Sequence, residues 1–411
     1  MQFRQQTLAN GLEIVAECNP QAYSASYAFF VRTGSRDEND ANSGVSHFLE
    51  HMVFKGTPTR TSIDVNRELD ELSSNSNAFT SEEHTVYYAT TLPEDQKPIV
   101  GLLSDIMRPS LRQEDFDTEK KVILEEIAKY DDQPPYGAHE KCMAAYFGDH
   151  PLGRSILGTT ESITALKREQ MLEYFEQRYS PKNIVLAAAG NIDFDALVDT
   201  ADKFCGKWQP FEAPRQLPPA GPRSSLQVFS KPQSVQQYIV QSSSAPSAES
   251  DARYASRVLA TIVGDDSGSR LFWELVDTGE VEYAAISAYE FQGTGILMSS
   301  ISCPPDSTEH ILKRVSDVLH DVEDHGVTEQ ELQQAKNKIC AHIVLQAERP
   351  TSRVFSVGNG WIQRRQYKTV REVVDAYRSV TLDDIQKILR QHPLTIQTTV
   401  AIGPRENLQL A

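Results

Sequence analysis

Cysteine is scarce in this sequence, and long hydrophobic runs are missing. The five cysteines among 411 residues are widely spaced, and none belongs to a Cys-x-x-Cys pair. An odd and sparse set of cysteines favours reduced thiols over a disulfide framework. No stretch contains the roughly eighteen apolar residues of a membrane-spanning helix, and the first residues lack the apolar segment of a secretory signal. We therefore expect a cytoplasmic protein without membrane association.

Positive charge is also in short supply. The chain has 40 Lys and Arg against 57 Asp and Glu, which gives a formal net charge of −17. Phosphate contacts need a basic surface, so this balance argues against nucleic acid as a partner. The composition, 39% hydrophobic and 24% charged, is typical of a folded globular protein. Because the chain is too long for one ordinary core, we expect two domains of similar size.

The most informative motif is His-x-x-Glu-His, formed by His47, Glu50 and His51. Apolar residues at helical spacing surround the motif and Gly56 follows it, so the segment is predicted to be a helix. Residues three and four positions apart share one face of a helix, which lets both imidazoles converge on one point. Neutral imidazoles suit Zn²⁺ in catalytic sites that keep a position open for water. Glu50 would then accept the proton of that water.

A helix with two histidines needs a further protein ligand, and residues 114–132 offer candidates. The apolar pattern of this segment predicts a helix. Glu119 and Glu126 lie two turns apart on it and therefore share a face. The neighbouring Glu125 points about 100° away from Glu126, so only one of these two can face the histidines.

The two histidines and the glutamates of these two segments resemble the signature of the inverzincin zinc peptidases, the pitrilysin and mitochondrial-processing-peptidase group. Two more stretches are similar to the same family. Arg32–Glu38 precedes the motif, and Asn77–Tyr87 contains the sequence Asn-Ala-Phe-Thr-Ser. The similarity is strong over the first half of the chain and weaker over the second half.

The resemblance implies a zinc metalloendopeptidase. His47, His51 and Glu126 would hold Zn²⁺, and Glu50 would be the catalytic base. Glu119 would assist catalysis by orienting a ligand or the helix pair without binding the metal itself. The alternative for Glu119 is an ordinary solvated residue on the helix surface.

The resemblance also implies an α+β fold of two tandem homologous α/β domains, each an antiparallel sheet with packed helices. Residues 213–225 are rich in proline and are predicted to link a zinc-binding catalytic domain, 1–212, to a homologous domain without metal, 226–411. The order of predicted elements repeats between the halves, which indicates an internal duplication. The segment 253–264 of the second copy contains no histidine, so one metal site is expected.

Asn77, Ala78 and Phe79 are expected to form an edge strand to which an extended peptide adds by β-augmentation. Because main-chain pairing reads shape more than sequence, the expected substrates are unfolded peptides, enclosed in a clam-like chamber. In the second half, Tyr283 stands where the family has the tyrosine of an Arg-Tyr substrate clamp, but Val276 replaces the arginine. Valine cannot donate a hydrogen bond. We therefore expect a heterodimer with a homologous subunit that supplies the arginine, with a homodimer as the alternative.

Two other functions remain open. The chain could be a non-catalytic peptide-binding or scaffold subunit of the same fold, although such subunits tend to lose the metal motif. It could also be a metal-dependent hydrolase with a non-peptide substrate. The sequence contains neither a phosphate-binding loop nor a nucleophile elbow, which argues against the second possibility.

Overall fold

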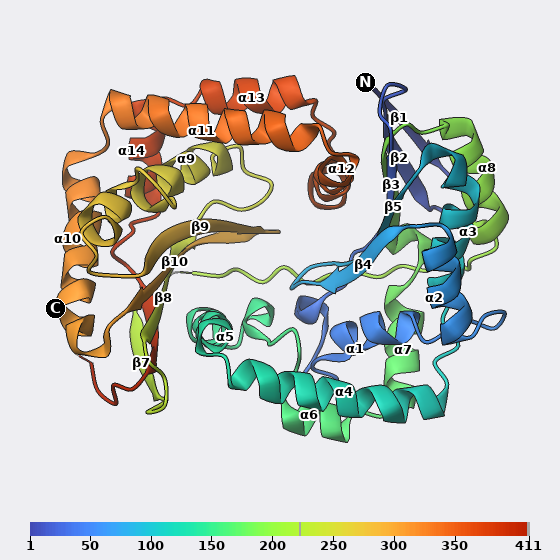
Figure 1. Cartoon of the computed structure of the whole chain (residues 1–411), viewed down its shortest axis with the longest axis horizontal. Helices are drawn as coiled ribbons and strands as arrows, with labels where there is room; N and C mark the ends of the chain where they lie inside the picture. Colours follow the sequence, from blue (N-terminus) through green and yellow to red (C-terminus); the bar gives the residue numbers. More distant parts are fainter. Residues whose placement is uncertain (222, 409–411) are drawn as a thin grey trace. The chain divides into compact units, whose positions relative to one another are not determined.

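The computed structural model describes residues 1–221 and 223–408, and the chain divides into two compact units (Figure 1). Each unit is built on one sheet whose two faces are covered by apolar side chains and helices. This is the predicted α+β arrangement. Unit 1 consists of Met1–Ile127, Arg154–Gln216 and Val344–Thr369, and unit 2 consists of Ala128–Gly153, Leu217–Ile343 and the chain from Val370 onward.

The sheet of unit 1 has six strands in the order β1-β2-β6-β3-β5-β4. All neighbouring strands are antiparallel except β2 and β6, which run parallel, so the predicted antiparallel sheet contains one parallel pair. The strand β4 lies at an edge. The strands are β1 Gln2–Thr7, β2 Glu13–Cys18, β3 Ala25–Val31, β4 Asn75–Thr80, β5 Thr85–Thr91 and β6 Ile184–Gly190.

Local sequence signals account for several turns and caps of unit 1. A turn at Asn10 and Gly11 joins β1 to β2, and Gly11 has a φ of 89°, a value that favours glycine. Thr61 caps the helix α2 in a capping box with Asp64. Short-range chemistry therefore sets where these elements begin.

Helices cover both faces of the unit 1 sheet. In Figure 1, α3 and α8 lie on one side of the sheet and α12 lies on the other. The side chains of α1, α3, α7 and α8 form one core with the first face. The helices are α1 Val45–Val53, α2 Ser62–Glu71, α3 Gln96–Ile106, α4 Gln113–Asp131, α6 Thr160–Ala165, α7 Arg168–Arg178, α8 Phe194–Cys205 and α12 Pro350–Arg364. Of these, α4 continues past Ile127 into unit 2.

The helix α12 comes from the second half of the chain but packs on the sheet of unit 1. Val354 and Val357 are buried against β3 and β6. Arg353 forms a buried ion pair with Glu17 of β2, with an Nε to Oε1 distance of 2.7 Å. The compact units therefore differ from the predicted ranges 1–212 and 226–411. The reason is that α12, which lies in the second half of the chain, packs its apolar side chains and Arg353 on the sheet of the first half.

The sheet of unit 2 has five strands in the order β7-β11-β8-β10-β9, with β7 and β11 parallel. This order repeats β2-β6-β3-β5-β4 of the first sheet, which supports the expected internal duplication. The strands are β7 Ser225–Ser230, β8 Gln237–Ala245, β9 Tyr283–Phe291, β10 Thr294–Cys303 and β11 Thr398–Gly403.

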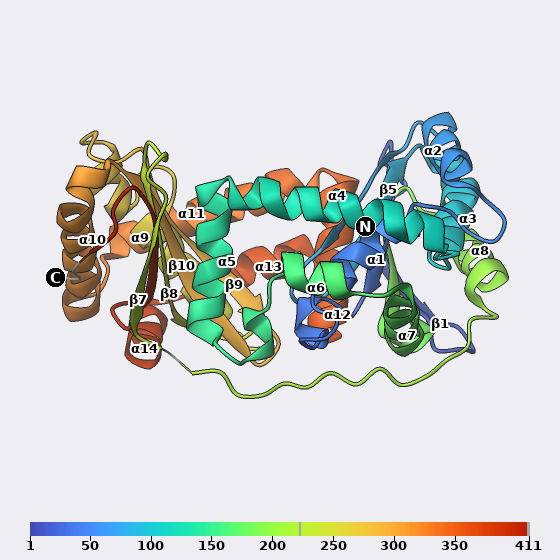
Figure 2. The same ribbon diagram turned by 90° about the horizontal axis from the view of Figure 1, so that it is seen from below.

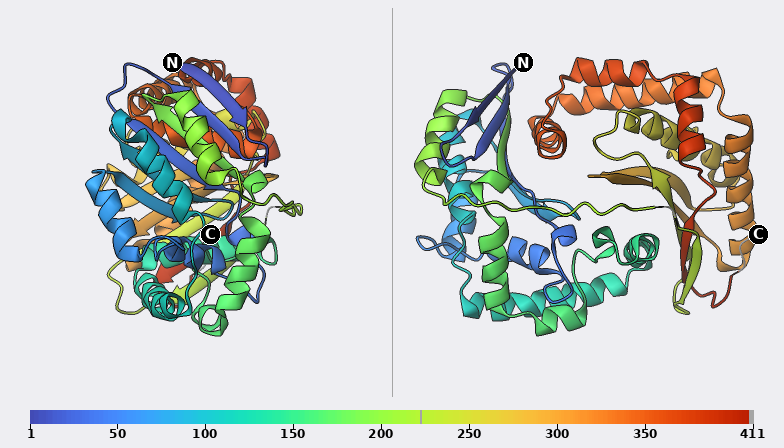
Figure 3. Two further views of the ribbon diagram at one scale, coloured as in Figure 1. Left: turned by 90° about the vertical axis from the view of Figure 1, so that its right-hand side faces the viewer. Right: turned by 180° about the vertical axis from the view of Figure 1, so that it is seen from behind.

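Figure 2 shows α10 and α5 on opposite sides of this second sheet, and Figure 3 shows the same elements from behind the view of Figure 1. The helix α5 belongs to the first half of the chain, and its buried residues form a core with β8 and β11. The helices are α5 Pro134–Phe147, α9 Arg253–Gly264, α10 Thr308–His325, α11 Glu329–Ala347, α13 Val370–Arg378 and α14 Leu382–Gln391. The two halves therefore exchange α5 and α12.

The predicted linker is fixed to unit 1 at its beginning. Arg215 is almost completely buried, and its guanidinium donates to both carboxylate oxygens of Asp37 at 2.9 and 2.6 Å and to the backbone carbonyl of Glu83. Arg178 donates to the carbonyl of Pro214 at 2.9 Å. A proline-rich composition does not reveal such ion pairs, so the sequence alone makes this segment look more independent than it is.

Within the described residues, the helices are all too short or too polar to cross a membrane. The five cysteines are unpaired, and four of them are buried.

The packing of α12 yields a stability prediction. Gly358 lies so close to β3 that an added Cβ would overlap the ring of the buried Phe30. Gly358→Val should lower the free energy of unfolding by about 1–3 kcal/mol through overpacking. Ser356→Ala, an exposed position on the same helix, is the control and should be nearly neutral. Chemical denaturation measures both, and equal stability of the two variants would contradict this packing.

Candidate metal centre

The helix α1, which carries the motif, is held by its apolar face and at its N-terminus. Its apolar face is buried in the core of unit 1. It begins after Gly44, whose φ of 88° lies in the left-handed region. The carboxylate of Glu38 accepts hydrogen bonds from the backbone N–H groups of Gly44 and Ser46, both at 2.7 Å. Burial raises the pKa of Glu38 to about 7, although these hydrogen bonds act in the opposite direction. Glu38 therefore serves as the N-terminal cap of this helix.

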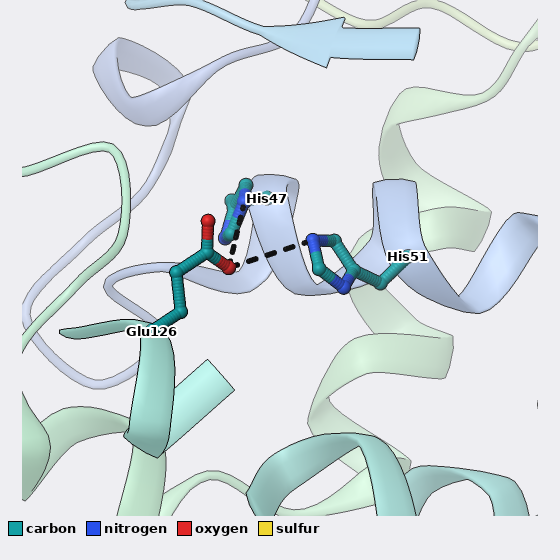
Figure 4. A group of neighbouring side chains, drawn as sticks. All are labelled: His47, His51 and Glu126. Atoms are coloured by element: carbon teal, nitrogen blue, oxygen red, sulfur yellow. Dashed lines mark ion pairs between the residues drawn. The ribbon is translucent and has the colours of Figure 1, made fainter. Parts of the chain in front are cut away.

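Two helices bring the three expected ligands together. His47 and His51 project from one face of α1, and their ring centroids are 4.7 Å apart. Glu126 extends from α4 toward both rings (Figure 4). Its Oε2 lies 3.8 Å from Nε2 of His47 and 3.7 Å from Nε2 of His51. Taken together, one donor atom from each residue lies within 4.8 Å of the others.

The structure distinguishes between the two adjacent glutamates of α4. Glu125 is exposed, whereas Glu126 is partly buried beside the histidines. This is the outcome that the helix geometry required, because neighbouring residues point about 100° apart.

Glu119 lies beside the histidines but contacts a different atom. Its Oε1 is 2.8 Å from Nδ1 of His51, and its Oε2 is 2.6 Å from Nζ of Lys55. Burial by itself would raise the pKa of Glu119, but the hydrogen bonds and charges of His51 and Lys55 outweigh it and lower the pKa. Glu119 is thus held as a carboxylate that accepts a hydrogen bond from Nδ1 of His51, the ring nitrogen that does not face Glu126. This position favours a role in orienting His51 over the alternative of a solvated residue on the helix surface.

Glu50 also faces inward and has a hydrogen-bond partner from the sheet. The hydroxyl of Thr80, at the end of β4, donates to Oε2 of Glu50 at 2.6 Å. Burial raises the pKa of Glu50, and Glu126 adds to this effect, while Thr80 and His51 lower it. The carboxylate of Glu50 is therefore a better proton acceptor than an exposed glutamate.

The protonation of His47 suits a metal, and the hydrogen bond of His51 defines which of its ring nitrogens faces the site. Burial lowers the pKa of His47 to about 3, which keeps this imidazole neutral. Burial also acts to lower the pKa of His51, but the Glu119 hydrogen bond and nearby carboxylates outweigh it and raise the pKa. With Nδ1 of His51 donating to Glu119, its Nε2 is the nitrogen available to a metal.

The donor set fits zinc. Atoms bound to one zinc ion at about 2.0–2.2 Å must lie within roughly 4 Å of one another. The distances from Glu126 to the two histidines, 3.8 and 3.7 Å, meet this condition, and the three donor atoms together lie within 4.8 Å of one another. Two imidazoles and one carboxylate leave a fourth coordination position open, as in catalytic zinc sites.

The predicted substrate strand β4 lies at the edge of its sheet. Asn77 is exposed, Ala78 is buried on the side of the sheet that packs against α1, and Phe79 packs on the other side. The N–H of Ala78 donates to the side-chain Oδ1 of Asn77 at 2.9 Å. The strand is available at the edge, and its role in binding substrate stays a prediction.

The two positions compared with the Arg-Tyr clamp belong to unit 2. Tyr283 begins β9 and is half-exposed, and burial together with Asp266 raises its pKa. Val276 ends a short π-helical turn, Phe272–Val276, and is partly buried against the core of unit 2. Tyr283 and Val276 therefore belong to the same unit, and their role in binding substrate stays a prediction.

Sequence reasoning missed the residues that support the site. Glu38 caps α1, Lys55 holds Glu119, and Thr80 holds Glu50. Lys55 follows His51 by four positions, so helical spacing could have drawn attention to it. Glu38 and Thr80 lie outside α1, so the periodicity of that helix does not indicate their contacts with it.

Comparisons with known proteins show the family. Residues 13–160 match the family described as Insulinase (Peptidase family M16), and residues 165–339 match the family described as Peptidase M16 inactive domain. The chain belongs to the M16 peptidase family. The label of the second match agrees with the lack of a histidine motif in residues 253–264.

Individual relatives cover nearly the whole chain. A protein of Mycobacterium tuberculosis, named an uncharacterized zinc protease, is 33% identical over 98% of this chain and 93% of its own length. A Bacillus subtilis protein named uncharacterized zinc protease YmxG is 27% identical, with 99% of both chains covered. A crystal structure of a protease from Helicobacter pylori superposes with a TM-score of 0.92 at 20% identity, covering 98% of this chain and 99% of that one. The last likeness shows the shared fold.

The identity of the carboxylate ligand can be tested directly. Glu126→Gln should lower zinc affinity by about 100-fold or more, because the site loses its anionic ligand while losses of outer hydrogen-bond partners alone cost about 10- to 100-fold. Glu125→Gln is the matched control and should bind zinc as the wild type does. Competition with a chromophoric chelator measures both. A loss confined to Glu125→Gln would contradict the ligand assignment.

Proposed function

We propose that the protein is a zinc-dependent endopeptidase that hydrolyses unfolded peptides. The observation that supports this most strongly is the convergence of His47, His51 and Glu126 next to the partly buried carboxylate of Glu50. Zinc held by the first three residues would polarise a carbonyl and lower the pKa of a bound water. Membership of a family whose relatives are named zinc proteases supports the same reaction class.

Glu50 would move the proton in this reaction. Its raised pKa suits a carboxylate that accepts a proton and then releases it to the leaving amine. One of its oxygens is held by Thr80, which leaves the other oxygen to exchange the proton. Glu119 and Lys55 would keep the His51 ring oriented, because the carboxylate fixes the proton on Nδ1.

The edge strand β4 would bind the substrate backbone. An incoming extended peptide could pair with the open side of this strand and replace the contact from Ala78 N–H to the Asn77 side chain. Pairing with backbone groups requires an extended segment, so folded proteins would be poor substrates. Phe79 would shape the approach from the opposite face of the sheet.

The catalytic role of Glu50 predicts a separation of binding from turnover. Glu50→Gln should lower kcat by at least about 100-fold, because an amide cannot accept the proton, while the zinc content stays near that of the wild type. Glu114→Gln, an exposed position on α4, is the control and should keep full activity. A quenched fluorescent peptide and metal analysis provide the two measurements. Substantial turnover by Glu50→Gln would remove this residue from the base role.

A non-catalytic scaffold of the same fold is the competing function. It would bind peptides and could retain zinc, but it would not cleave. Stoichiometric zinc together with no chelator-sensitive hydrolysis, by the chain alone and with its homologous partner, would favour the scaffold.

We also propose that the active form is a heterodimer. Val276 occupies the position where the resemblance implies an arginine, so a homologous subunit with that arginine would complete the substrate clamp beside Tyr283. The purified chain alone should cleave unstructured peptides at least about 10-fold more slowly than a mixture with that subunit, if the missing donor costs about 1.4 kcal/mol or more. Full activity of a homodimer, without gain on adding the homologous subunit, would contradict this proposal.

A further inference from the structure

We infer that Thr80 is a positioning residue that ties the catalytic base Glu50 to the edge strand β4. The inference rests on the proposed peptidase function, which gives Glu50 its role. Thr80 belongs to the strand expected to pair with substrate, and its hydroxyl holds the carboxylate that would take up the proton. One strand would therefore align both the peptide and the base.

The direction of this hydrogen bond follows from its neighbours. The Thr80 hydroxyl lies 2.6 Å from Oε2 of Glu50 and 3.4 Å from the Thr85 hydroxyl. Thr85 donates its own hydrogen to the backbone carbonyl of Thr33 at 3.0 Å. Both neighbours can therefore only accept from Thr80, because an ionised carboxylate has no hydrogen to donate, and the hydrogen is directed to the much nearer Glu50 oxygen. A distance of about 2.5–2.7 Å is usual for a hydroxyl that donates to an ionised carboxylate.

The alternation of side chains along β4 explains why Thr80 can reach the site. Successive residues of a strand point to opposite faces of the sheet. Ala78 belongs to the core that contains α1, so Thr80, two residues on, points to the same side. Phe79 points the other way and meets Phe355 of α12, with ring centroids 5.8 Å apart. The strand β4 is thus packed against α12 on one face of the sheet, while Thr80 faces Glu50 on the other.

The hydroxyl of Thr80 supplies the hydrogen bond that holds Glu50 in place. Among the residues that the structure describes, Thr80 is the hydrogen-bond donor to the Glu50 carboxylate. Glu50 is partly buried, and a buried carboxylate that loses its donor is left with an unfavourable environment. It would then turn toward other partners, and misplacement of a base by about 1 Å can cost roughly 100-fold in rate.

The test compares Thr80→Val, which removes only the hydroxyl, with Thr80→Ser, which keeps it. Thr80→Val should lower kcat by about 10- to 100-fold, with KM changed less than about threefold and zinc content unchanged. Thr80→Ser should restore most of the activity. Thr164→Val makes the same substitution on the exposed side of α6 and should behave as the wild type.

A second readout does not depend on activity. Crystal structures of the metal-free variants should show Glu50 in one position in the wild type and in Thr80→Ser, but displaced or in several positions in Thr80→Val. If Thr80→Val does not fold, Thr80→Ala provides the same comparison.

An unmoved Glu50 in Thr80→Val, unchanged kcat, an effect on KM alone, or failure of Thr80→Ser to rescue would each overturn the inference. If the wild type cleaves no peptide, the proposed function fails, and the crystallographic comparison still decides whether Thr80 positions Glu50.

Discussion

The candidate metal centre depends on the packing of α1 against α4. The rings of Phe48 and Phe116 stack between these helices, with centroids 4.7 Å apart and an interplanar angle of 13°, and both are fully buried. This contact sets the distance from the two histidines to Glu126. A helix that slipped by one turn would move its side chains by about 5.4 Å, which is more than the whole spread of the ligand atoms. A well-packed apolar contact therefore fixes the geometry of a polar site.

Charges around the site are compensated in pairs. Lys55 offsets Glu119, Glu119 orients His51, and the N-terminal N–H groups of α1 receive Glu38. Such pairing matters because a buried carboxylate without partners costs free energy. The same logic explains the beginning of the linker, where Arg215 joins the buried Asp37. The buried charged groups around the candidate site are thus paired with groups of opposite charge or with hydrogen-bond donors.

Much of this architecture could be predicted from sequence, for identifiable reasons. The motif at His47 and His51 and the two-turn spacing of Glu119 and Glu126 are periodic signals within single helices, and they located the residues that the structure brings together. The exchange of α5 and α12, the parallel strand pairs and the contact of Thr80 with Glu50 depend on segments far apart in the chain. Local periodicity carries no information about such partners. The substrate roles of Asn77 and Tyr283 stay predictions.

The proposed function requires that His47, His51 and Glu126 together hold zinc. X-ray absorption spectroscopy of the zinc-loaded protein tests it most directly, because it reports the donor atoms themselves. We expect two imidazole nitrogens at about 2.0–2.1 Å, oxygen donors at about 2.0–2.2 Å and no sulfur. Glu126→Ala should change the oxygen shell and leave the two imidazoles. A sulfur donor near 2.3 Å, or a spectrum without imidazole scattering, would contradict this ligand set.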